Sequence, residues 1–296
     1  MATLTFHDDP VEFLDVARDH LAADPVVSTV VATAAERAAR EDADGFPVDA
    51  PHRWWVVARD DAGHVTGTAM RTAPFSPYPL FVLPMPHDAA LALAGALHER
   101  DEMVGGVNGA LPSAEICAAE VARLQSCSLD VQIHTRLHRL DIVVPPRPAA
   151  GRLRAARADE VGLAFEWYVA FARDADEQAG RDPGSHHDMG ETEEGMARRI
   201  GEERVWFWVD ADDQPVHVTG INPPAFGAAR IGPVYTPREH RGRGFAGNAV
   251  ALLSQRILDA GDQPCLYTDQ ANPTSNQLYA ALGYVPVVDM VELRVD

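Results

Sequence analysis

The sequence predicts a mixed α/β protein built from two similar halves, each with a mostly antiparallel sheet flanked by helices. Its 296 residues are enough for two domains of about 150 residues each. A proline-rich segment at residues 143–150 cannot continue a helix or a central strand. The order of elements that precedes this segment returns after it. We therefore expect domains at residues 1–144 and 151–296, joined by a linker at residues 145–150.

In the first half, apolar residues recur at helical spacing in some segments, and β-branched and aromatic residues cluster in others. The first helix opens at Asp9, with Pro10 in its first turn, and a turn sequence at residues 60–63 joins two strands. The predicted helices are residues 11–23, 27–40, 88–100 and 113–124. The predicted strands are residues 54–59, 65–72, 80–83 and 104–107, followed by an extended segment at residues 129–144.

The second half repeats this order with little shared sequence, which predicts a tandem duplication. Asp159 caps its first helix, and a polar loop at residues 174–190 leads to the second. The predicted helices are residues 159–173, 192–201, 245–260 and 275–282. The predicted strands are residues 153–155, 205–209, 215–221, 229–235, 265–268 and 285–295, and the last is expected to close the second sheet.

The composition narrows the classes of function. The formal charge is −19, from 44 acidic and 25 basic side chains, and every basic one is arginine. So negative a chain repels phosphate backbones and anionic lipid surfaces, which argues against general nucleic-acid or membrane binding. Its three cysteines show no metal-ligand or redox spacing, and the chain begins without the pattern of a secretory signal. We expect a cytoplasmic protein.

One segment, residues 231–246, has the pattern of an anion-binding turn. A strand ends within it, and a helix opens at about Gly244. The free amides at a helix start lie at the positive end of the helix dipole. Gly242 and Gly244 let main-chain amides approach a ligand, and Arg241 and Arg243 add positive charge. We interpret this turn as a site for a pyrophosphate.

A dinucleotide cofactor is one candidate ligand, because Gly242, Gly244 and Gly247 fit the spacing G-x-G-x-x-G. In true dinucleotide sites, however, this motif follows its strand directly and begins a longer parallel sheet. Here six residues, Pro237 to Gly242, come after the strand, and only 27 residues remain after Asp269. The sequence therefore disfavours a nicotinamide or flavin site.

The turn also reads Arg241-x-x-Gly244-x-Ala246, which resembles the coenzyme A signature Q/R-x-x-G-x-G/A of the GCN5-related N-acetyltransferases. A second landmark of that family is similar to residues 272–284, where an Asn is followed seven residues later by Tyr279 and then by a Gly-Tyr pair. The resemblance covers residues 153–296 in sequence, and the first half only in its order of elements. It predicts two tandem copies of that fold, each with a splayed pair of parallel strands.

The first copy departs from the family pattern at its strand–helix junction, residues 82–89. The junction has no glycine and no arginine at the cradle positions, and Pro84 and Pro86 remove two amide donors. We expect a degenerate first copy that does not bind coenzyme A in the family manner.

For the second copy, the resemblance implies acetyl-coenzyme A as co-substrate, held between the splayed strands that end at Tyr235 and Thr268. The strand backbone would pair with the pantetheine arm, main-chain amides would hold the pyrophosphate, and the start of the last helix would contact the arm. The residues implied for cofactor binding are Val234, Tyr235, Thr236, Arg241, Gly242, Arg243, Gly244, Phe245, Ala246, Asn272 and Asn276.

The implied chemistry is direct attack of an amine on the thioester in a ternary complex. A main-chain amide of the splayed strand would stabilise the carbonyl oxygen as it becomes anionic. Tyr279 stands where the family places the acid that protonates the leaving thiolate, because a phenol stays protonated at neutral pH. The alternative is that Tyr279 only packs between helix and sheet. The sequence does not identify the base: His217 reads more readily as a structural histidine, and water relayed to an acidic residue is equally open.

Two further features concern partners. The acidic residues of the loop 174–194 would attract a cationic amine, or they form a solvated loop in a chain that is acidic throughout. The sequence His186-His187-Asp188 lacks further ligands at helical spacing, so we predict no metal site. The leading hypothesis is an N-acetyltransferase that acts on a primary amine of a small molecule or peptide. The alternative is a non-catalytic acyl-coenzyme A sensor or interaction protein.

Overall fold

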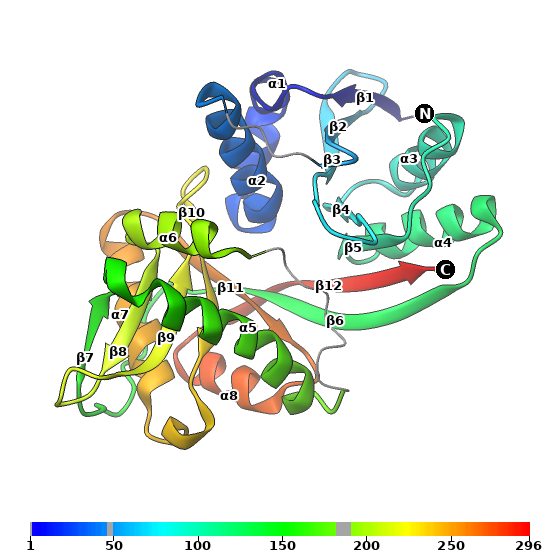
Figure 1. The fold of residues 1–296 in the computed structure, drawn as a ribbon. Coiled ribbons are helices and arrows are strands. Elements are labelled where there is room, and N and C mark those ends of the chain that lie inside the picture. The colour runs from blue at the N-terminus through cyan, green and yellow to red at the C-terminus, as the bar shows by residue number, and fades with distance from the viewer. Residues whose placement is uncertain (1, 46–49, 182–190) are drawn as a thin grey trace. The chain divides into compact units, whose positions relative to one another are not determined.

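A computed structural model of the chain describes residues 2–45, 50–181 and 191–296 (Figure 1). The chain divides into two compact units. Unit 1 comprises Met1–Leu137 and Val287–Asp296, and unit 2 comprises His138–Pro286. The sequence places the boundary at residue 144 and the whole C-terminal segment in the second domain, so the two divisions differ at the end of each half.

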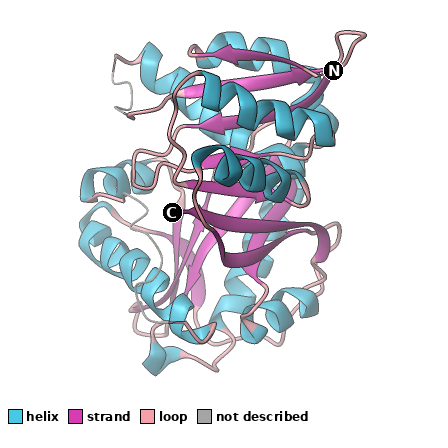
Figure 2. Ribbon diagram, turned by 90° about the vertical axis from the view of Figure 1, so that its right-hand side faces the viewer, coloured by secondary structure: helices cyan, strands magenta, loops and turns pink. Residues whose placement is uncertain are grey.

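Unit 1 combines a mixed sheet with helices on both of its faces (Figure 2). Its strands follow the order β1-β2-β3-β4-β5-β12-β6, in which β4 and β5 are parallel. The strands are β1 (Thr3–His7), β2 (Trp54–Arg59), β3 (Val65–Arg71), β4 (Leu80–Val82), β5 (Gly106–Ala110), β6 (Leu129–Arg139) and β12 (Val285–Val295). The helices are α1 (Pro10–Ala23), α2 (Pro25–Ala43), α3 (His87–Glu99) and α4 (Ser113–Gln125).

Two local features of unit 1 test the sequence analysis. The Asp9 side chain accepts a hydrogen bond from the Val11 amide at 2.8 Å, so the predicted cap of α1 is confirmed. Strand β1 was not predicted, although Leu4 and Phe6 alternate with polar residues along it. It is held by antiparallel pairing with β2, a contact distant in sequence.

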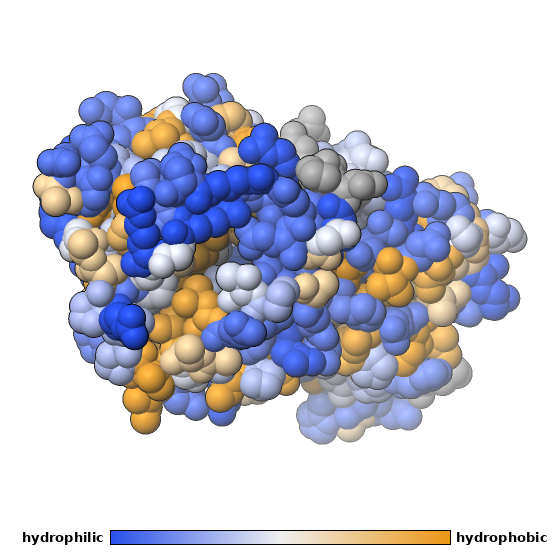
Figure 3. Space-filling model, turned by 90° about the horizontal axis from the view of Figure 1, so that it is seen from below, coloured by the Kyte–Doolittle hydropathy of each residue, from blue (hydrophilic) through white to orange (hydrophobic). Residues whose placement is uncertain are grey.

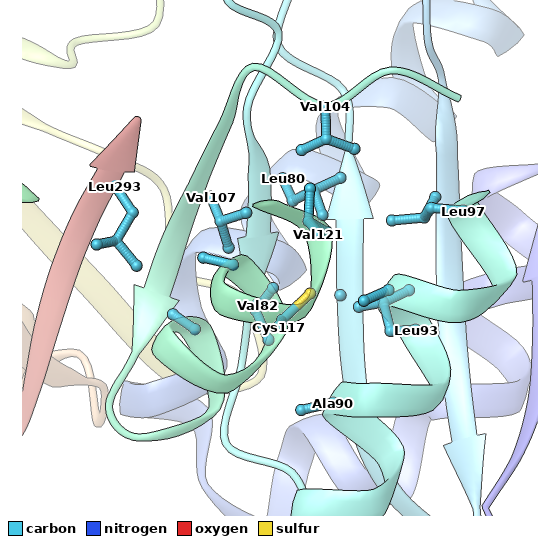
Figure 4. Packing of buried hydrophobic residues seen from close by; sticks show 14 of the residues in the cluster. Leu80, Val82, Ala90, Leu93, Leu97, Val104, Val107, Cys117, Val121 and Leu293 are labelled. Carbon is cyan, nitrogen blue, oxygen red and sulfur yellow. The ribbon is translucent and has the colours of Figure 1, made fainter. Parts of the chain in front are cut away.

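The last strand lies in the sheet of unit 1, so the expectation that it closes the second sheet is wrong. β12 pairs antiparallel with β5, with Leu293 opposite Val107. Val291, Leu293 and Val295 are buried in the core formed with α3 and α4, and Figure 4 shows Leu293 beside Val107. The alternation of apolar residues predicts a strand with one buried face, but it does not specify which sheet receives that face.

Unit 2 follows the same plan. Its strands follow the order β11-β10-β9-β8-β7, in which β10 and β11 are parallel. The strands are β7 (Arg152–Ala155), β8 (Val205–Val209), β9 (Pro215–Ile221), β10 (Ala228–Tyr235) and β11 (Gln263–Asp269). The helices are α5 (Val161–Gln178), α6 (Glu193–Gly201), α7 (Phe245–Asp259) and α8 (Pro273–Ala281), with 3-10 turns η1 (Ala158–Glu160) and η2 (Arg238–His240).

The end of β6 belongs to unit 2. There the Leu140 amide donates to the Pro264 carbonyl at 3.0 Å, beside the start of β11. In each unit, therefore, the second strand of the parallel pair has a neighbour from the other half of the sequence. β12 lies next to β5 in unit 1, and the end of β6 lies next to β11 in unit 2. This exchange explains why the units do not coincide with a single cut in the chain.

The sheet of unit 2 is covered on both faces. Apolar side chains of α5 and α6 pack with Phe207 and Val218 on one face. Residues of α7 and α8 pack with Ala229, Ile231 and Leu266 on the other. Neighbouring strand residues point to opposite faces, so this division assigns the residues of β11, and those of β10 up to the irregularity after Ile231, to one side each.

The surface and the helices are polar. The face seen in Figure 3 is mostly hydrophilic, with smaller hydrophobic patches between the polar side chains. Within the part of the chain that the structure describes, every helix is too short or too polar to cross a lipid bilayer.

The strand exchange can be tested with Leu293→Ala. Leu293 is 3% exposed, so its truncation is expected to lower the free energy of unfolding by about 2–5 kcal/mol. Hydrogen exchange should localise the loss to unit 1, including β5. The control is Leu252→Ala, because Leu252 is 47% exposed. Loss of protection confined to unit 2 would contradict the exchange.

Candidate functional site

The parallel strands of unit 2 separate along their length. The backbone register between β10 and β11 ends with Arg230 opposite Cys265, although β10 continues to Tyr235 and β11 to Asp269. On its other edge, β10 remains paired with β9 as far as Tyr235, through an irregularity between Ile231 and Val234. The edge of β10 that faces β11 is therefore without a strand partner over its last residues.

A short turn after β10 leads into α7, as predicted. Gly242 and Gly244 have φ angles of 75° and 82°, a region that favours glycine. Phe245 anchors the start of α7, where its ring stacks on Trp208 at a centroid distance of 6.4 Å. The helix has no side-chain cap, and within the described residues the amides of 242–247 have no hydrogen-bond acceptor. Six adjacent main-chain donors are thus available to an anion.

Arg241 holds the strand end rather than pointing at these amides. Its Nε donates to the Thr236 carbonyl at 2.9 Å, and its Nη2 donates to Asp174 Oδ2 at 2.6 Å. The Arg241 amide donates to the Arg238 carbonyl at 3.3 Å, so the run of free donors begins at Gly242. The side chain of Arg243 is exposed beside the turn.

Asp174 is a buried carboxylate beneath this turn and was not singled out as a structural residue from the sequence. It is 2% exposed and accepts hydrogen bonds from the Tyr235 hydroxyl at 3.2 Å and from Arg238 at 3.3 Å. Burial acts to raise the pKa of Asp174, but the hydrogen bonds from Arg238 and Tyr235 and the charge of Arg241 hold that pKa below its usual value. The carboxylate therefore stays ionised and fixes the end of β10.

The end of α5 joins the ends of both separated strands. Arg181 contacts Asp176, with a donor–acceptor distance of 3.3 Å, and also Asp269 at the end of β11. Asn272 donates to Gln178 Oε1 at 3.2 Å. The sequence predicts that α5 ends at residue 173, but the helix continues to Gln178, because these polar residues pair with the strand ends instead of entering a solvated loop.

The two asparagines shape the turn between β11 and α8. Asn272 caps α8, where its Oδ1 accepts from the Thr274 and Ser275 amides at 3.1 and 3.2 Å. Asn276 donates to the carbonyls of Asp269 and Gln270 at 3.1 and 3.2 Å. Their side chains stand beside the separated end of β11, and their contact with a cofactor arm stays a prediction.

Tyr279 lies on α8 in the core between α7 and the sheet. It is 7% exposed, and its ring centroid is 5.9 Å from that of Tyr284, whose hydroxyl bonds Ser254 at 2.7 Å. Burial raises the pKa of Tyr279, so the phenol stays protonated at neutral pH. Among the described residues its hydroxyl has no hydrogen-bond partner. The ring therefore packs in the core while the hydroxyl remains available to donate a proton. Its role as the acid stays a prediction.

His217 is a structural residue at the strand end. It is fully buried, with Nδ1 2.8 Å from Thr236 Oγ1 and Nε2 2.6 Å from Thr219 Oγ1. Burial lowers the pKa of His217 to about 3, so the ring is neutral. This geometry favours the structural alternative, in which His217 orients Thr236 beside the separated strands.

Most described carboxylates of the acidic segment are neutralised within the protein. Asp174 and Asp176 are paired as above, Glu177 contacts Arg238, and Glu191 lies 3.1 Å from Arg199. Asp182 and the His186-His187-Asp188 sequence lie outside the described residues. Among the residues that the structure does describe, no group of three metal-ligating side chains converges.

Comparison with known proteins shows which fold this geometry belongs to. A family model described as FR47-like protein matches residues 221–293, from the end of β9 into β12. A GCN5-related N-acetyltransferase from Sphaerobacter thermophilus is 16% identical with a TM-score of 0.58, over 99% of this chain and 95% of that one. The chain has the GCN5-related N-acetyltransferase fold. The predicted resemblance is confirmed.

Two further solved structures support the tandem arrangement of this fold. An acetyltransferase of the family from Colwellia psychrerythraea is 12% identical with a TM-score of 0.54, over 99% of this chain and all of that one. A tandem protein of the family from the clavulanic acid biosynthesis pathway is 16% identical with a TM-score of 0.52, over 99% of this chain and 98% of that one. A search of curated proteins found no match.

The first copy of the acetyltransferase fold differs at the equivalent place. β4 stays paired with β5 up to its last residue, Val82, opposite Gly109. A side chain at Gly109 would lie 2.1 Å from the Val82 carbonyl, so the two strands are in close contact. Ser113 Oγ accepts from the Met85 amide at 3.0 Å and donates to the Met85 carbonyl at 3.1 Å. The protein itself thus satisfies the main chain at Met85, in contrast with the turn of unit 2.

His217→Gln tests the buried neutral histidine. The pKa is about 3 when folded and 6.5 in its ordinary state. Between these values the unfolded chain binds the additional proton, so the free energy of unfolding decreases by ~1.4 kcal/mol for each unit by which the pH is lowered, for this group alone. The variant lacks this loss, and its stability relative to the wild type should rise as pH falls from about 7 to about 5.

Urea denaturation across this pH range gives the comparison, with His134→Gln, an exposed histidine, as control. Parallel curves for the wild type and His217→Gln would show that His217 is not held neutral by burial.

Proposed function

We propose that unit 2 transfers an acetyl group from acetyl-coenzyme A to a primary amine of a small molecule or peptide, by direct attack in a ternary complex. The observation that carries the proposal is a path defined by two sets of free main-chain groups. One is the separated edge of β10, and the other is the amides of residues 242–247 on the far side of η2. An extended chain that ends in a pyrophosphate fits such a path, because it can pair with the strand and accept from the helix start.

The residues of the turn fit the pyrophosphate. An added Cβ at Gly242 or Gly244 would meet open space or only distant atoms, so the site is open above both glycines. Their positive φ angles turn successive amides the same way. In this proposal the cradle consists of Gly242, Arg243, Gly244, Phe245 and Ala246. Arg241 would act indirectly, because its side chain hydrogen-bonds the Thr236 carbonyl and not the ligand.

The strand edge would hold the pantetheine arm. Val234, Tyr235 and the Thr236 amide would offer main-chain groups there. Pro233 offers no amide, and the Thr236 carbonyl already accepts from Arg241. Tyr235 and Thr236 are fixed from below by Asp174 and His217. This rigidity matters because preorganised donors stabilise a developing oxyanion without reorganising during the reaction. A main-chain amide of this segment is the proposed oxyanion donor.

The thioester supplies an activated acyl group and a thiolate leaving group. Tyr279 would give the thiolate its proton, since the raised pKa keeps the phenol protonated over the physiological range. The acceptor is a small-molecule or peptide amine that attacks in its neutral form. Asn272 and Asn276 would support the arm beside β11.

Ala246→Glu tests the cradle without disturbing the helix. A carboxylate in the first turn of α7 suits the helix dipole, so the fold should persist. Beside the pyrophosphate it repels the ligand, and affinity for coenzyme A should fall by about tenfold or more, roughly 1.4 kcal/mol. Calorimetry measures the affinity, and Ala246→Gln is the uncharged control of similar size. Equal affinity for all three proteins would show that the cradle is misplaced.

Tyr279→Phe tests the acid. The substitution keeps the ring and removes the hydroxyl, so kcat should fall about tenfold or more while the affinity for acetyl-coenzyme A is retained. Tyr284→Phe is the matched control: it removes a neighbouring buried hydroxyl that bonds Ser254, and should lower stability by about 1 kcal/mol with little change in kcat. Unchanged turnover in Tyr279→Phe would remove the acid role. Coenzyme A binding without transfer to any amine of a broad panel would favour the sensor alternative.

A further inference from the structure

Arg230 lies where β10 and β11 separate. It is opposite Cys265, in the last register pair of the two strands. Its sequence neighbours Ala229 and Ile231 pack in the core beneath α7 and α8. Because strand side chains alternate, Arg230 points to the opposite face, which α5 and α6 cover.

Within the part of the chain that the structure describes, Arg230 has no hydrogen-bond or ion-pair partner on that face. Among the described residues, its Nη1 is shielded from solvent and has no hydrogen-bond acceptor, and the side chain forms no ion pair. Burial lowers the pKa of Arg230, and the nearby charges of Arg199 and Arg204 lower it further. The Arg230 side chain is half-buried and its Nη1 is enclosed. A partly buried charge without a counter-charge is unfavourable, and such charges in proteins are normally paired or bind a ligand.

Two phenolic hydroxyls on the same face are also enclosed without partners. Tyr267 follows Cys265 by two residues on β11, so it points the same way as Arg230, and the charge of Arg230 acts on it. Tyr168 extends from α5 toward β9, where its hydroxyl lies close to Gly220. A Cβ added at Gly220 would be 2.3 Å from this hydroxyl and 2.7 Å from the Gly232 carbonyl oxygen. Three enclosed donor atoms, Arg230 Nη1 and the hydroxyls of Tyr267 and Tyr168, thus lie on the face that α5 and α6 cover, without partners among the described residues.

Within the described part of the chain, Arg230 is the local arginine without an acidic partner. Arg199 lies 3.1 Å from Glu191, and Arg204 lies 3.0 Å from Glu202, so both have acidic partners. Arg230 has none among the described residues. In a chain with a formal charge of −19, one unpaired guanidinium with hydroxyl donors beside it is matched by a single carboxylate, which can accept two parallel bonds from an arginine.

We propose that this face is the acceptor subsite of the acetyltransferase, and that Arg230 and Tyr267 bind a carboxylate carried by the amine acceptor. The inference rests on the proposed function and adds its substrate class, amino carboxylates. The carboxylate is assigned to the acceptor because a ligand that pairs with the edge of β10 lies in the plane of the sheet, whereas Arg230 projects out of that plane. Tyr168 completes the subsite from α5.

The test compares matched acceptors with the full chain and acetyl-coenzyme A. The probes are unbranched ω-amino carboxylates of increasing length, the alkylamines of the same length without the acid group, and aminoalkyl phosphonates. We expect kcat/KM for the best amino carboxylate to exceed that of its alkylamine by about 100-fold or more, because an acceptor without the acid leaves buried donors unpaired. The aminoalkyl phosphonate, whose acid group carries two charges, should have a lower kcat/KM than the amino carboxylate of the same length.

Arg230→Met replaces the guanidinium with an apolar side chain of similar length, and Arg230→Lys keeps the charge without the planar fork. In Arg230→Met the preference for amino carboxylates should vanish through KM, while calorimetry shows unchanged affinity for coenzyme A. Arg230→Lys should retain part of the preference. Tyr267→Phe is the second variant and should weaken it less, since it removes one neutral donor.

Thermal shift of the wild type by the amino carboxylates, absent in Arg230→Met, gives a readout independent of turnover. The inference is overturned if amines are acetylated without regard to the carboxylate, or if Arg230→Met keeps the preference. It is also overturned if no amino carboxylate shifts the melting temperature, or if the enzyme instead prefers an acyl-coenzyme A whose acyl group carries the acid. Failure of the proposed function itself is distinct, because coenzyme A would then not bind, or would bind without transfer to any amine, whether or not that amine carries a carboxylate.

Discussion

The separation of β10 from β11 after the pair Arg230–Cys265 determines the rest of the site. Main-chain groups inside a protein need partners, and a strand edge without a neighbouring strand leaves them free. In unit 2 the free edge continues into a helix start with free amides. One elongated ligand with strand-like and anionic parts can satisfy both. In unit 1 the corresponding main-chain groups have partners within the protein. Gly109 allows β5 to stay paired with β4, and the Ser113 hydroxyl hydrogen-bonds the main chain of Met85.

The separated strands are held open by polar contacts from α5. Asp174 fixes the end of β10 through Tyr235 and Arg241, and Arg181 reaches Asp269 at the end of β11. These charges are partly buried, so they are shielded from salt more than surface ion pairs are. The acidic composition thus has a structural role here, because several carboxylates serve as anchors instead of attracting a cationic substrate.

The sequence predicts those parts of the site that depend on local chemistry. The glycines at 242 and 244 and the start of α7 follow from backbone geometry, which a few neighbouring residues determine. The order of helices and strands follows from the periodicity of apolar residues. The spacing of two motifs predicts the fold family, which the comparisons confirm.

The sequence does not predict what depends on contacts between distant residues. The place of β12 beside β5 depends on which sheet accepts its apolar face, and the alternation of Val291 and Leu293 is the same in either sheet. The extra turns of α5 depend on partners far along the chain, such as Asp269. Arg230 carries no motif, and it is distinguished by its enclosed Nη1 and by the lack of a counter-charge within the part of the chain that the structure describes.

Hydrogen exchange of the full chain with and without coenzyme A tests the central claim most directly. If the free edge of β10 and the start of α7 form one binding path, coenzyme A should slow exchange at residues 234–236 and at residues 242–247 together. The junction at residues 83–89 of unit 1 should be unaffected and serves as the internal reference. Saturating coenzyme A that protects neither segment, or that protects the junction of unit 1 instead, would contradict the account.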